Sequence, residues 1–213
     1  MPAPTRRRTV MGRYDASAAS YDGLYREEQG QKARRLAAMG FRPGRCVVEV
    51  GCGSGVALRA LQARADISVG ADISIQMLRR IRGGRIEPVL CDATRPPLRD
   101  GCADSLLLVT SFHHFPYKRR AARRAWRILR PGGLAGLSLL KAAGDSLGVF
   151  VAATGARRLA LEEGRKDVYA LLQKRGVSKP APAPLPAALS SISSRLPAPN
   201  CRAAGAGRRI RGT

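Results

Sequence analysis

The stretch Val47-Val48-Glu49-Val50-Gly51-Cys52-Gly53-Ser54-Gly55 decides how this chain folds. An apolar run of strand type leads into three glycines at alternate positions, and residues 56–64 follow with helical character. Glycine in such a loop lets the backbone turn tightly and approach a ligand closely. The order of strand, glycine loop and helix predicts a βαβ unit with a ligand at the end of the strand.

The glycine loop has the pattern G-x-G-x-G, whereas a dinucleotide fingerprint needs a glycine where Val56 stands. Glu49 lies inside the strand, and a carboxylate so close to the ligand repels a pyrophosphate and attracts a cation. No Gly-Lys-Ser/Thr follows, so a P-loop is excluded. The loop therefore favours a ligand with a positive centre.

Two further acidic residues follow the next two apolar runs. A carboxylate in the position of Asp72 accepts hydrogen bonds from ribose hydroxyls in nucleoside-binding folds. Asp92 is expected to accept from an adenine amino group. The structural alternatives are a helix N-cap for Asp72, where Ser74 competes for the same role, and a turn before Pro96 for Asp92.

Residues 41–141 alternate short apolar runs with helical segments, which predicts an α/β fold: a Rossmann-like three-layer αβα sandwich with a mainly parallel sheet. The expected strands are Cys46–Val50, Ile67–Ala71, Ile86–Leu90, Ser105–Thr110 and Leu134–Leu140. The expected helices are Val56–Arg64, Ile75–Arg82 and Tyr117–Leu129.

Along the chain we expect four parts. Residues 1–13 form a basic N-terminal extension and residues 14–40 a helical cap segment, in which Tyr14, Ala18, Tyr21 and Tyr25 recur on one helical face. Residues 41–176 form the ligand-binding domain. Residues 177–213 are rich in proline and alanine and are expected to be a disordered tail.

The chain carries 38 Lys and Arg against 15 Asp and Glu, a formal net charge of +23. No apolar run is long enough to span a membrane, and no secretory signal is recognised. The five cysteines form no C-x-x-C pair, so neither a metal site nor a disulfide framework is expected. This cysteine usage is typical of a reducing, cytoplasmic setting.

Much of the positive charge lies in residues 118–130, which hold seven basic residues and no acidic one. Helical spacing directs Arg120, Arg123, Arg124 and Arg127 outward as one stripe. One interpretation is a surface that follows RNA phosphates, and the other is a solvated helix in an arginine-rich protein.

The motifs, in this order, resemble those of class I S-adenosylmethionine-dependent methyltransferases over about residues 14–140. Ile128–Gly133 is similar to the turn before the fifth strand of that family, and Tyr14–Tyr25 is similar to a segment of its quinone-biosynthesis branch. The resemblance implies S-adenosyl-L-methionine as cofactor, with Tyr21 of the capping segment close to it. The implied cofactor contacts are Glu49, Gly51, Cys52, Gly53, Gly55, Asp72, Ile73, Asp92, Ala93 and Tyr21.

The only two histidines, His113 and His114, follow the expected fourth strand, where residues facing the methyl acceptor belong in this architecture. Methyl transfer needs a general base only when the acceptor must lose a proton, and histidine has the side-chain pKa nearest neutrality. His114 is the preferred candidate because related sequences often carry His-Phe here, although histidine also occurs there without a catalytic role. The segment lacks Asn/Asp-Pro-Pro-Tyr/Phe, which argues against methylation of adenine N6 and amides.

In this family two antiparallel strands normally complete the sheet at its C-terminal end. Residues 167–175 are interpreted as a helix, so we expect the strand pair to be missing and the fifth strand to be an exposed edge. The candidate acceptors are a small molecule of the quinone-precursor type and RNA. The alternative is a non-catalytic, basic RNA-binding protein that retains the fold, which the missing strands would favour.

Overall fold

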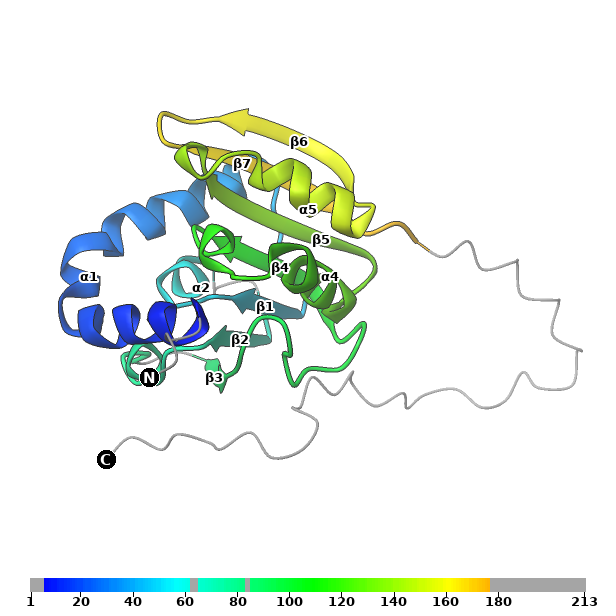
Figure 1. The fold of residues 1–213 in the computed structure, drawn as a ribbon. Coiled ribbons are helices and arrows are strands. Elements are labelled where there is room, and N and C mark those ends of the chain that lie inside the picture. Colours follow the sequence, from blue (N-terminus) through cyan, green and yellow to red (C-terminus); the bar gives the residue numbers. More distant parts are fainter. Residues whose placement is uncertain (1–5, 62–64, 83–84, 177–213) are drawn as a thin grey trace, which may run out of the picture.

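The computed structural model describes residues 6–61, 65–82 and 85–176. Its strands form one sheet in the order β3-β2-β1-β4-β5-β7-β6 (Figure 1). The strands are β1 (Cys46–Val50), β2 (Ile67–Asp72), β3 (Ile86–Leu90), β4 (Ala103–Val109), β5 (Leu129–Leu140), β6 (Arg157–Glu163) and β7 (Asp167–Gln173). The first five strands pair in parallel with one another, and β7 runs antiparallel to both β5 and β6.

Helices cover both faces of the sheet (Figure 1). One side carries α1 (Arg6–Ala38), α2 (Val56–Leu61) and α3 (Ile75–Leu78). The other side carries α4 (Lys118–Ile128) and α5 (Ser146–Thr154). Single 3₁₀ turns occupy Phe112–His114 and Lys141–Ala143. The predicted three-layer α/β sandwich with a mainly parallel sheet is confirmed.

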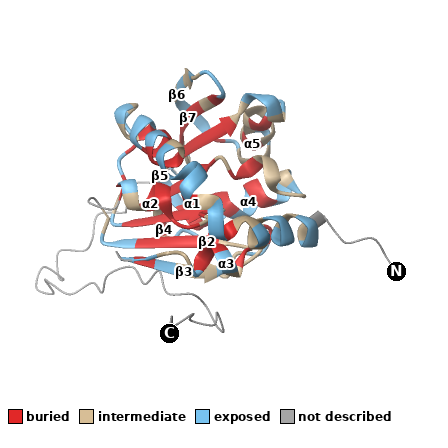
Figure 2. Ribbon diagram, turned by 90° about the vertical axis from the view of Figure 1, so that its left-hand side faces the viewer, coloured by how far each residue is buried: buried red, intermediate tan, exposed pale blue. Residues whose placement is uncertain are grey.

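The central strands are buried on both faces because alternate side chains enter different cores. Val47 and Leu107 pack with Leu58 of α2, whereas Val48 and Leu106 pack with Trp126 of α4. Figure 2 shows the buried strands enclosed between partly exposed helices. This double burial explains why the strands appear in the sequence as unbroken apolar runs.

The predicted strands Cys46–Val50 and Ile86–Leu90 have the bounds that the structure gives. The strands β2 and β4 differ from their predicted bounds by one or two residues. Leu129–Leu140 begins earlier than predicted, because Leu129 already pairs with Ala103 of β4 and the backbone of Gly132 and Gly133 hydrogen-bonds to that of Lys174.

The prediction of a missing C-terminal strand pair is wrong. Arg157–Glu163 and Asp167–Gln173 form an antiparallel hairpin, and the second strand pairs with β5 along seven residues. The predicted helix over 167–175 is therefore a strand. Ala, Leu and Gln favour helix in isolation, but burial of Ala170, Leu171 and Leu172 between neighbours outweighs that preference.

The boundary predicted between residues 13 and 14 is also not a structural one. The helix α1 is continuous from Arg6 to Ala38, so the basic segment and the cap segment form a single element. Figure 1 shows that α1 changes direction along its length. The tail predicted for 177–213 lies outside the described residues.

Two features are absent from the described ranges. No helix there is long and apolar enough to cross a membrane. Within the same ranges, no group of three or more His, Cys, Asp or Glu residues is arranged to hold a metal ion.

Candidate functional site

A cavity lies where β1, β2, β3 and β4 end, and α1 contributes to its lining. Parallel strands bring the residues that follow them to one edge of the sheet, the usual place for a ligand in open α/β folds. Most of the predicted site residues line this cavity: Glu49, Gly51, Cys52, Gly53, Asp72, Ile73, Asp92, Ala93, Tyr21 and His114. Gly55 and His113 are not among the lining residues.

The three glycines of the loop adopt left-handed backbone conformations, which glycine tolerates better than other residues. Gly51, Gly53 and Gly55 have φ angles of +77°, +55° and +76°. At Gly51 the space is also restricted, because a Cβ atom there would lie 2.4 Å from the Cβ atom of Ser111. The loop backbone therefore passes directly against the residues that follow β4.

Glu49 projects a buried carboxyl group into this region, with only 2% of the residue exposed. Its Oε2 atom has no hydrogen-bond partner among the described residues. Burial, reinforced by the charge of Asp72, raises the pKa of Glu49 well above its usual value. A positive group in the cavity would stabilise the charged form of Glu49, which agrees with the cationic ligand predicted from the sequence.

Asp72 lies at the end of β2 and joins two loops. Its Oδ2 accepts from the backbone N–H of Gly53 at 2.8 Å, and its Oδ1 accepts from that of Ser74 at 2.9 Å. Burial raises the pKa of Asp72, although the backbone donors oppose this effect. The hydroxyl of Ser74 caps α3 by accepting from Met77, so the competing N-cap role belongs to Ser74.

Asp92 has both a turn role and a place in the cavity. Its Oδ1 accepts from the backbone N–H of Thr94 at 2.7 Å. Its Oδ2 lies 2.7 Å from Nε of Arg7, whose Nη2 donates to the Thr94 hydroxyl at 3.1 Å. Sequence reasoning missed Arg7 because it assigned this residue to a separate extension.

Two acidic residues of α1 hold the helix against the same edge of the sheet. Asp15 accepts from the Ser74 hydroxyl at 2.5 Å, and Asp22 accepts a short hydrogen bond from the Ser54 hydroxyl. With Arg7, these residues connect α1 to the loops after β1, β2 and β3. No sequence motif singled out Asp15 or Asp22 for this role, although both lie in the segment that the family resemblance identified.

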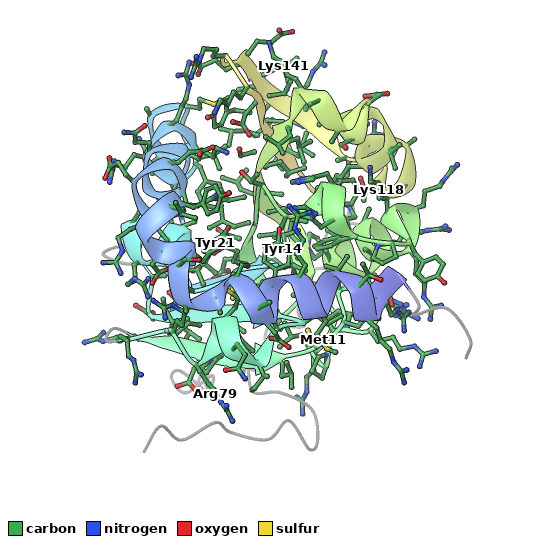
Figure 3. The ribbon with its side chains drawn as sticks, turned by 60° about the vertical axis from the view of Figure 1, so that its left-hand side comes forward. Met11, Tyr14, Tyr21, Arg79, Lys118 and Lys141 are labelled. Atoms are coloured by element: carbon green, nitrogen blue, oxygen red, sulfur yellow. The ribbon has the colours of Figure 1, made fainter. Side chains whose placement is uncertain are left out.

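Tyr14 and Tyr21 lie on the side of α1 that faces the strand ends (Figure 3). Their ring centroids are 6.1 Å apart, and Tyr14 also contacts the ring of His114 at 5.3 Å. Burial raises the pKa of Tyr14 to about 12. Tyr25 continues the predicted stripe by packing on Tyr21, but it is 43% exposed and does not line the cavity.

The cavity ends at the residues that follow β4, where Thr110, Ser111, His114, Phe115 and Pro116 line it. Burial, together with the charges of Arg13 and Lys118, lowers the pKa of His114. His114 is therefore mostly neutral at pH 7 and able to accept a proton. Burial, with His114 and nearby cations, lowers the pKa of His113 to about 4.

The arginine stripe of α4 faces outward, as predicted. Within the stripe, Arg127 pairs with Asp100 at 2.5 Å, and Arg130, which lies beyond α4 in β5, pairs with Asp104 at 2.9 Å. Arg119, Arg120, Arg123 and Arg124 are exposed, and no ion pair is recorded for them within the described residues.

The residues that line the cavity fit a nucleoside with a cationic tail. Asp72 and Asp92 lie at the ends of neighbouring strands and offer acceptors for hydroxyl and amino donors. Glu49 offers a buried negative charge, and the glycine loop leaves space between these acids for close backbone approach. The far end, lined by His114 and Phe115, is left for a second molecule.

Residues 48–137 match a family model described as a methyltransferase domain. A demethylmenaquinone methyltransferase of Mycolicibacterium paratuberculosis is 30% identical over 132 residues, which cover 59% of this chain and 57% of that protein. The tRNA (carboxymethyluridine(34)-5-O)-methyltransferase ALKBH8 of Mus musculus is 32% identical over 96 residues, covering 43% of this chain and 14% of that protein. The chain thus spans little more than half of the first relative and a small part of the second.

Solved structures share the fold at lower sequence identity. A putative methyltransferase solved with the Trm112 methyltransferase activator of Haloferax volcanii gives a TM-score of 0.66 at 17% identity, over 76% of this chain and 97% of that one. Magnesium protoporphyrin IX methyltransferase of Synechocystis with bound S-adenosylmethionine gives 0.65 at 15% identity, over 82% and 99%. The motifs, the fold and the matched family model agree on a methyltransferase domain with the class I fold over residues 48–137, and these likenesses support S-adenosyl-L-methionine as the cofactor.

Proposed function

We propose that this chain transfers the methyl group of S-adenosylmethionine to a small aromatic acceptor. The observation that carries the proposal is the composition of a single cavity. One end holds the acids Glu49, Asp72 and Asp92, and the other holds the rings of Tyr14 and His114. A cationic nucleoside and a planar acceptor would meet between these two ends.

In this proposal the nucleoside end is divided among three strand ends. Glu49 and the loop at Gly51, Cys52, Gly53 and Gly55 hold the aminoacyl and sulfonium part. Asp72 and Ile73 hold the ribose, while Asp92 and Ala93 hold the adenine. Tyr21 covers the cofactor from α1. The unpartnered Oε2 atom of Glu49 and the hydrogen-bonded orientation of Asp72 support these roles.

When bound, the cofactor would supply a methyl group carried on a positively charged sulfur. In-line attack by the acceptor would take the methyl group and leave the sulfur as a neutral thioether. The protein's share of the work is to align the acceptor and exclude water. The helix α1 serves both purposes, because its contacts through Arg7, Asp15 and Asp22 keep it across the cavity. His114 takes the proton when the acceptor must lose one, since its lowered pKa keeps it neutral at pH 7.

Two observations favour a small acceptor. The cavity is covered by α1, and its acceptor end is lined by the aromatic or apolar side chains of Tyr14, Phe115 and Pro116. A planar ring fits between such groups. The relative named for demethylmenaquinone methylation shares the longer alignment with this chain, which agrees with an acceptor of this kind.

RNA is the second candidate acceptor. The exposed cations of α4, which begins directly after the acceptor-side loop, would contact phosphates, and a relative is named for tRNA methylation. The non-catalytic alternative was favoured by the expected absence of the C-terminal strand pair. Because β6 and β7 are present and complete the sheet, that support is lost.

The cofactor role is tested by calorimetric titration with S-adenosylmethionine and S-adenosylhomocysteine. Both should bind the wild-type chain, and Asp72→Asn should weaken both by about tenfold or more, because a ribose partner is lost. Asp66→Asn is the matched control, since Asp66 is an exposed partner of Arg45 and lies outside the cavity. No binding to the folded wild-type protein would defeat the proposal.

The acceptor is tested with radiolabelled methyl transfer into demethylmenaquinol and, separately, into total tRNA. We expect label in the quinol and unchanged rates when Arg120 and Arg124 are both replaced by Ala. Label in tRNA that falls in this double variant would instead establish the RNA candidate.

A further inference from the structure

Lys32 of α1 is a buried cation beside the acceptor end of the cavity, with 3% of the residue exposed. Its ammonium group lies 2.9 Å from Oγ1 of Thr110, 2.7 Å from Oε1 of Glu28 and 3.2 Å from Oδ2 of Asp167. Lysine has three N–H donors, so these contacts use all of them. A lysine is rarely buried without such partners, and here they fix the ammonium in one position.

Thr110 is the residue through which this cation reaches the cavity. It follows β4, lines the cavity and donates its backbone N–H to the carbonyl of Ser138 at 2.8 Å. Its φ angle of +52° is in the left-handed region, which is unusual for a β-branched residue. Strained residues of this kind cluster at ligand sites, because the surrounding contacts must hold them in place.

The hydroxyl group of Thr110 has a remaining donor. A threonine hydroxyl carries one hydrogen and two acceptor lone pairs, and one lone pair already accepts from Lys32. Within the described part of the chain, no protein acceptor is recorded for the hydroxyl hydrogen. Accepting from a cation polarises the hydroxyl and makes it a stronger donor to a second partner.

We infer that the Thr110 hydroxyl, polarised by Lys32, donates a hydrogen bond to a ring oxygen of the methyl acceptor, and that the acceptor is a phenol or hydroquinone. The inference rests on the proposed function and names the substrate class of the same site. Thr110 would be a specificity-determining contact, while Lys32 acts through it as a positioning residue.

The electrostatics of this end of the cavity agree with a phenolic oxygen. After burial, Lys118, Lys32 and Arg13 all contribute to lowering the pKa of His113, and Arg13 and Lys118 do the same for His114. These cations would attract the partial negative charge of a ring oxygen, and they oppose the effect of burial, which raises the pKa of the neighbouring phenol of Tyr14. Glu28 and Asp167 balance the charge of Lys32, so the oxygen is bound through the polarised hydroxyl rather than through a bare ammonium.

The test uses 4-nitrophenol as a spectroscopic probe with the full chain saturated by S-adenosylhomocysteine. Its visible absorbance reports the ionised fraction, so one titration gives both affinity and the bound probe's apparent pKa. In the wild type we expect saturable binding, and an apparent pKa of the bound probe that is lower than in Thr110→Val. Thr110→Ser, which keeps the hydroxyl, should behave similarly, whereas Thr110→Val should bind the ionised probe about tenfold more weakly.

Lys32→Met provides the second comparison, because it keeps the Thr110 hydroxyl and removes its polarisation. We expect the pKa of the bound probe to be higher than in the wild type, with weaker binding of its ionised form. This variant leaves Glu28 and Asp167 without their cation and is prone to misfold, so the Thr110 pair decides the question. A merely structural Lys32 would change thermal stability without changing the probe's pKa.

The outcomes separate this inference from the proposed function. If S-adenosylhomocysteine fails to bind the wild type, the proposed function fails. A second outcome is that S-adenosylhomocysteine binds the wild type and Thr110→Val equally. If 4-nitrophenol then does not bind, or binds both proteins alike, the inference about Thr110 is overturned and the cofactor site stands.

Discussion

Nε of Arg7 lies 2.7 Å from Oδ2 of Asp92, so the beginning of α1 is joined to the loop that follows β3. The two side chains come from residues far apart in the sequence, and both line the cavity. A cofactor bound at Asp92 would therefore lie against the beginning of α1, and it would have to pass this part of the helix on entering or leaving.

This relationship predicts the effect of Arg7→Ala. The ion pair is partly exposed, so its loss should cost about 0.2–1 kcal/mol, and S-adenosylhomocysteine should dissociate up to about fivefold faster. Stopped-flow displacement measures that rate. Arg8→Ala is the control, because Arg8 is exposed and lies outside the cavity lining. Equal dissociation rates in both variants would contradict a closing role for Arg7.

Gly51→Ala should damage both stability and cofactor binding. The new Cβ atom would lie 2.4 Å from that of Ser111, at a φ angle of +77° that disfavours alanine. We expect a loss of about 1–3 kcal/mol in the free energy of unfolding by urea. Gly23→Ala is the matched control, since nothing lies within 4 Å of its added Cβ atom and α1 is helical there. It should stabilise the protein by about 0.5–1 kcal/mol.

Glu49→Gln should have opposite effects on stability and on binding. Burial raises the pKa of Glu49, so the folded protein holds a proton there over a pH range in which the unfolded chain has released it. The contribution of the neutral Glu49 carboxyl group to the free energy of unfolding is therefore lost as the pH rises from the pKa of the unfolded chain to that of the folded protein. At pH 7.5 the glutamine variant should unfold at a higher urea concentration, yet bind S-adenosylmethionine about tenfold more weakly. Weaker folding together with unchanged binding would contradict this role.

The histidine pair predicts a loss of stability in mild acid. The pKa of His113 is lowered to about 4, so between pH 4 and 6.5 the unfolded state binds more protons than the folded state. Stability therefore falls as pH decreases through this window. Urea unfolding of His113→Gln at pH 7.5 and pH 5 should show a smaller decrease than the wild type. An identical decrease would show that the acid sensitivity arises elsewhere.

The sequence was most informative about the position of strands that are buried on both faces of the sheet. Cys46–Val50 and Ile86–Leu90 could be located because strands covered on both faces appear as short apolar runs bounded by turns. The hairpin of β6 and β7 could not, since Arg157–Glu163 and Asp167–Gln173 are rich in helix-forming residues. Pairing with β5, a contact distant in sequence, decides their conformation.

The candidate site divides in the same way. Glu49, Asp72 and Asp92 could be recognised from the sequence because each lies at or near the end of a recognisable strand. Arg7 and Lys32 were not, since both lie in basic or mixed-charge stretches of α1 where nothing distinguishes them from solvated neighbours. Their partners, Asp92 and Thr110, come from other parts of the fold, and only the folded chain brings them together.

The two halves of α1 differ in how firmly they are held. Ala33 and Leu36 of the second half are fully buried against the sheet, whereas the first half is held largely by polar contacts through Arg7, Asp15 and Asp22. Local opening should therefore begin in the first half and leave the sheet intact. Such opening would dismantle the cover of the cavity without unfolding the domain, so the ability to retain a ligand should disappear at lower denaturant concentration than the sheet itself.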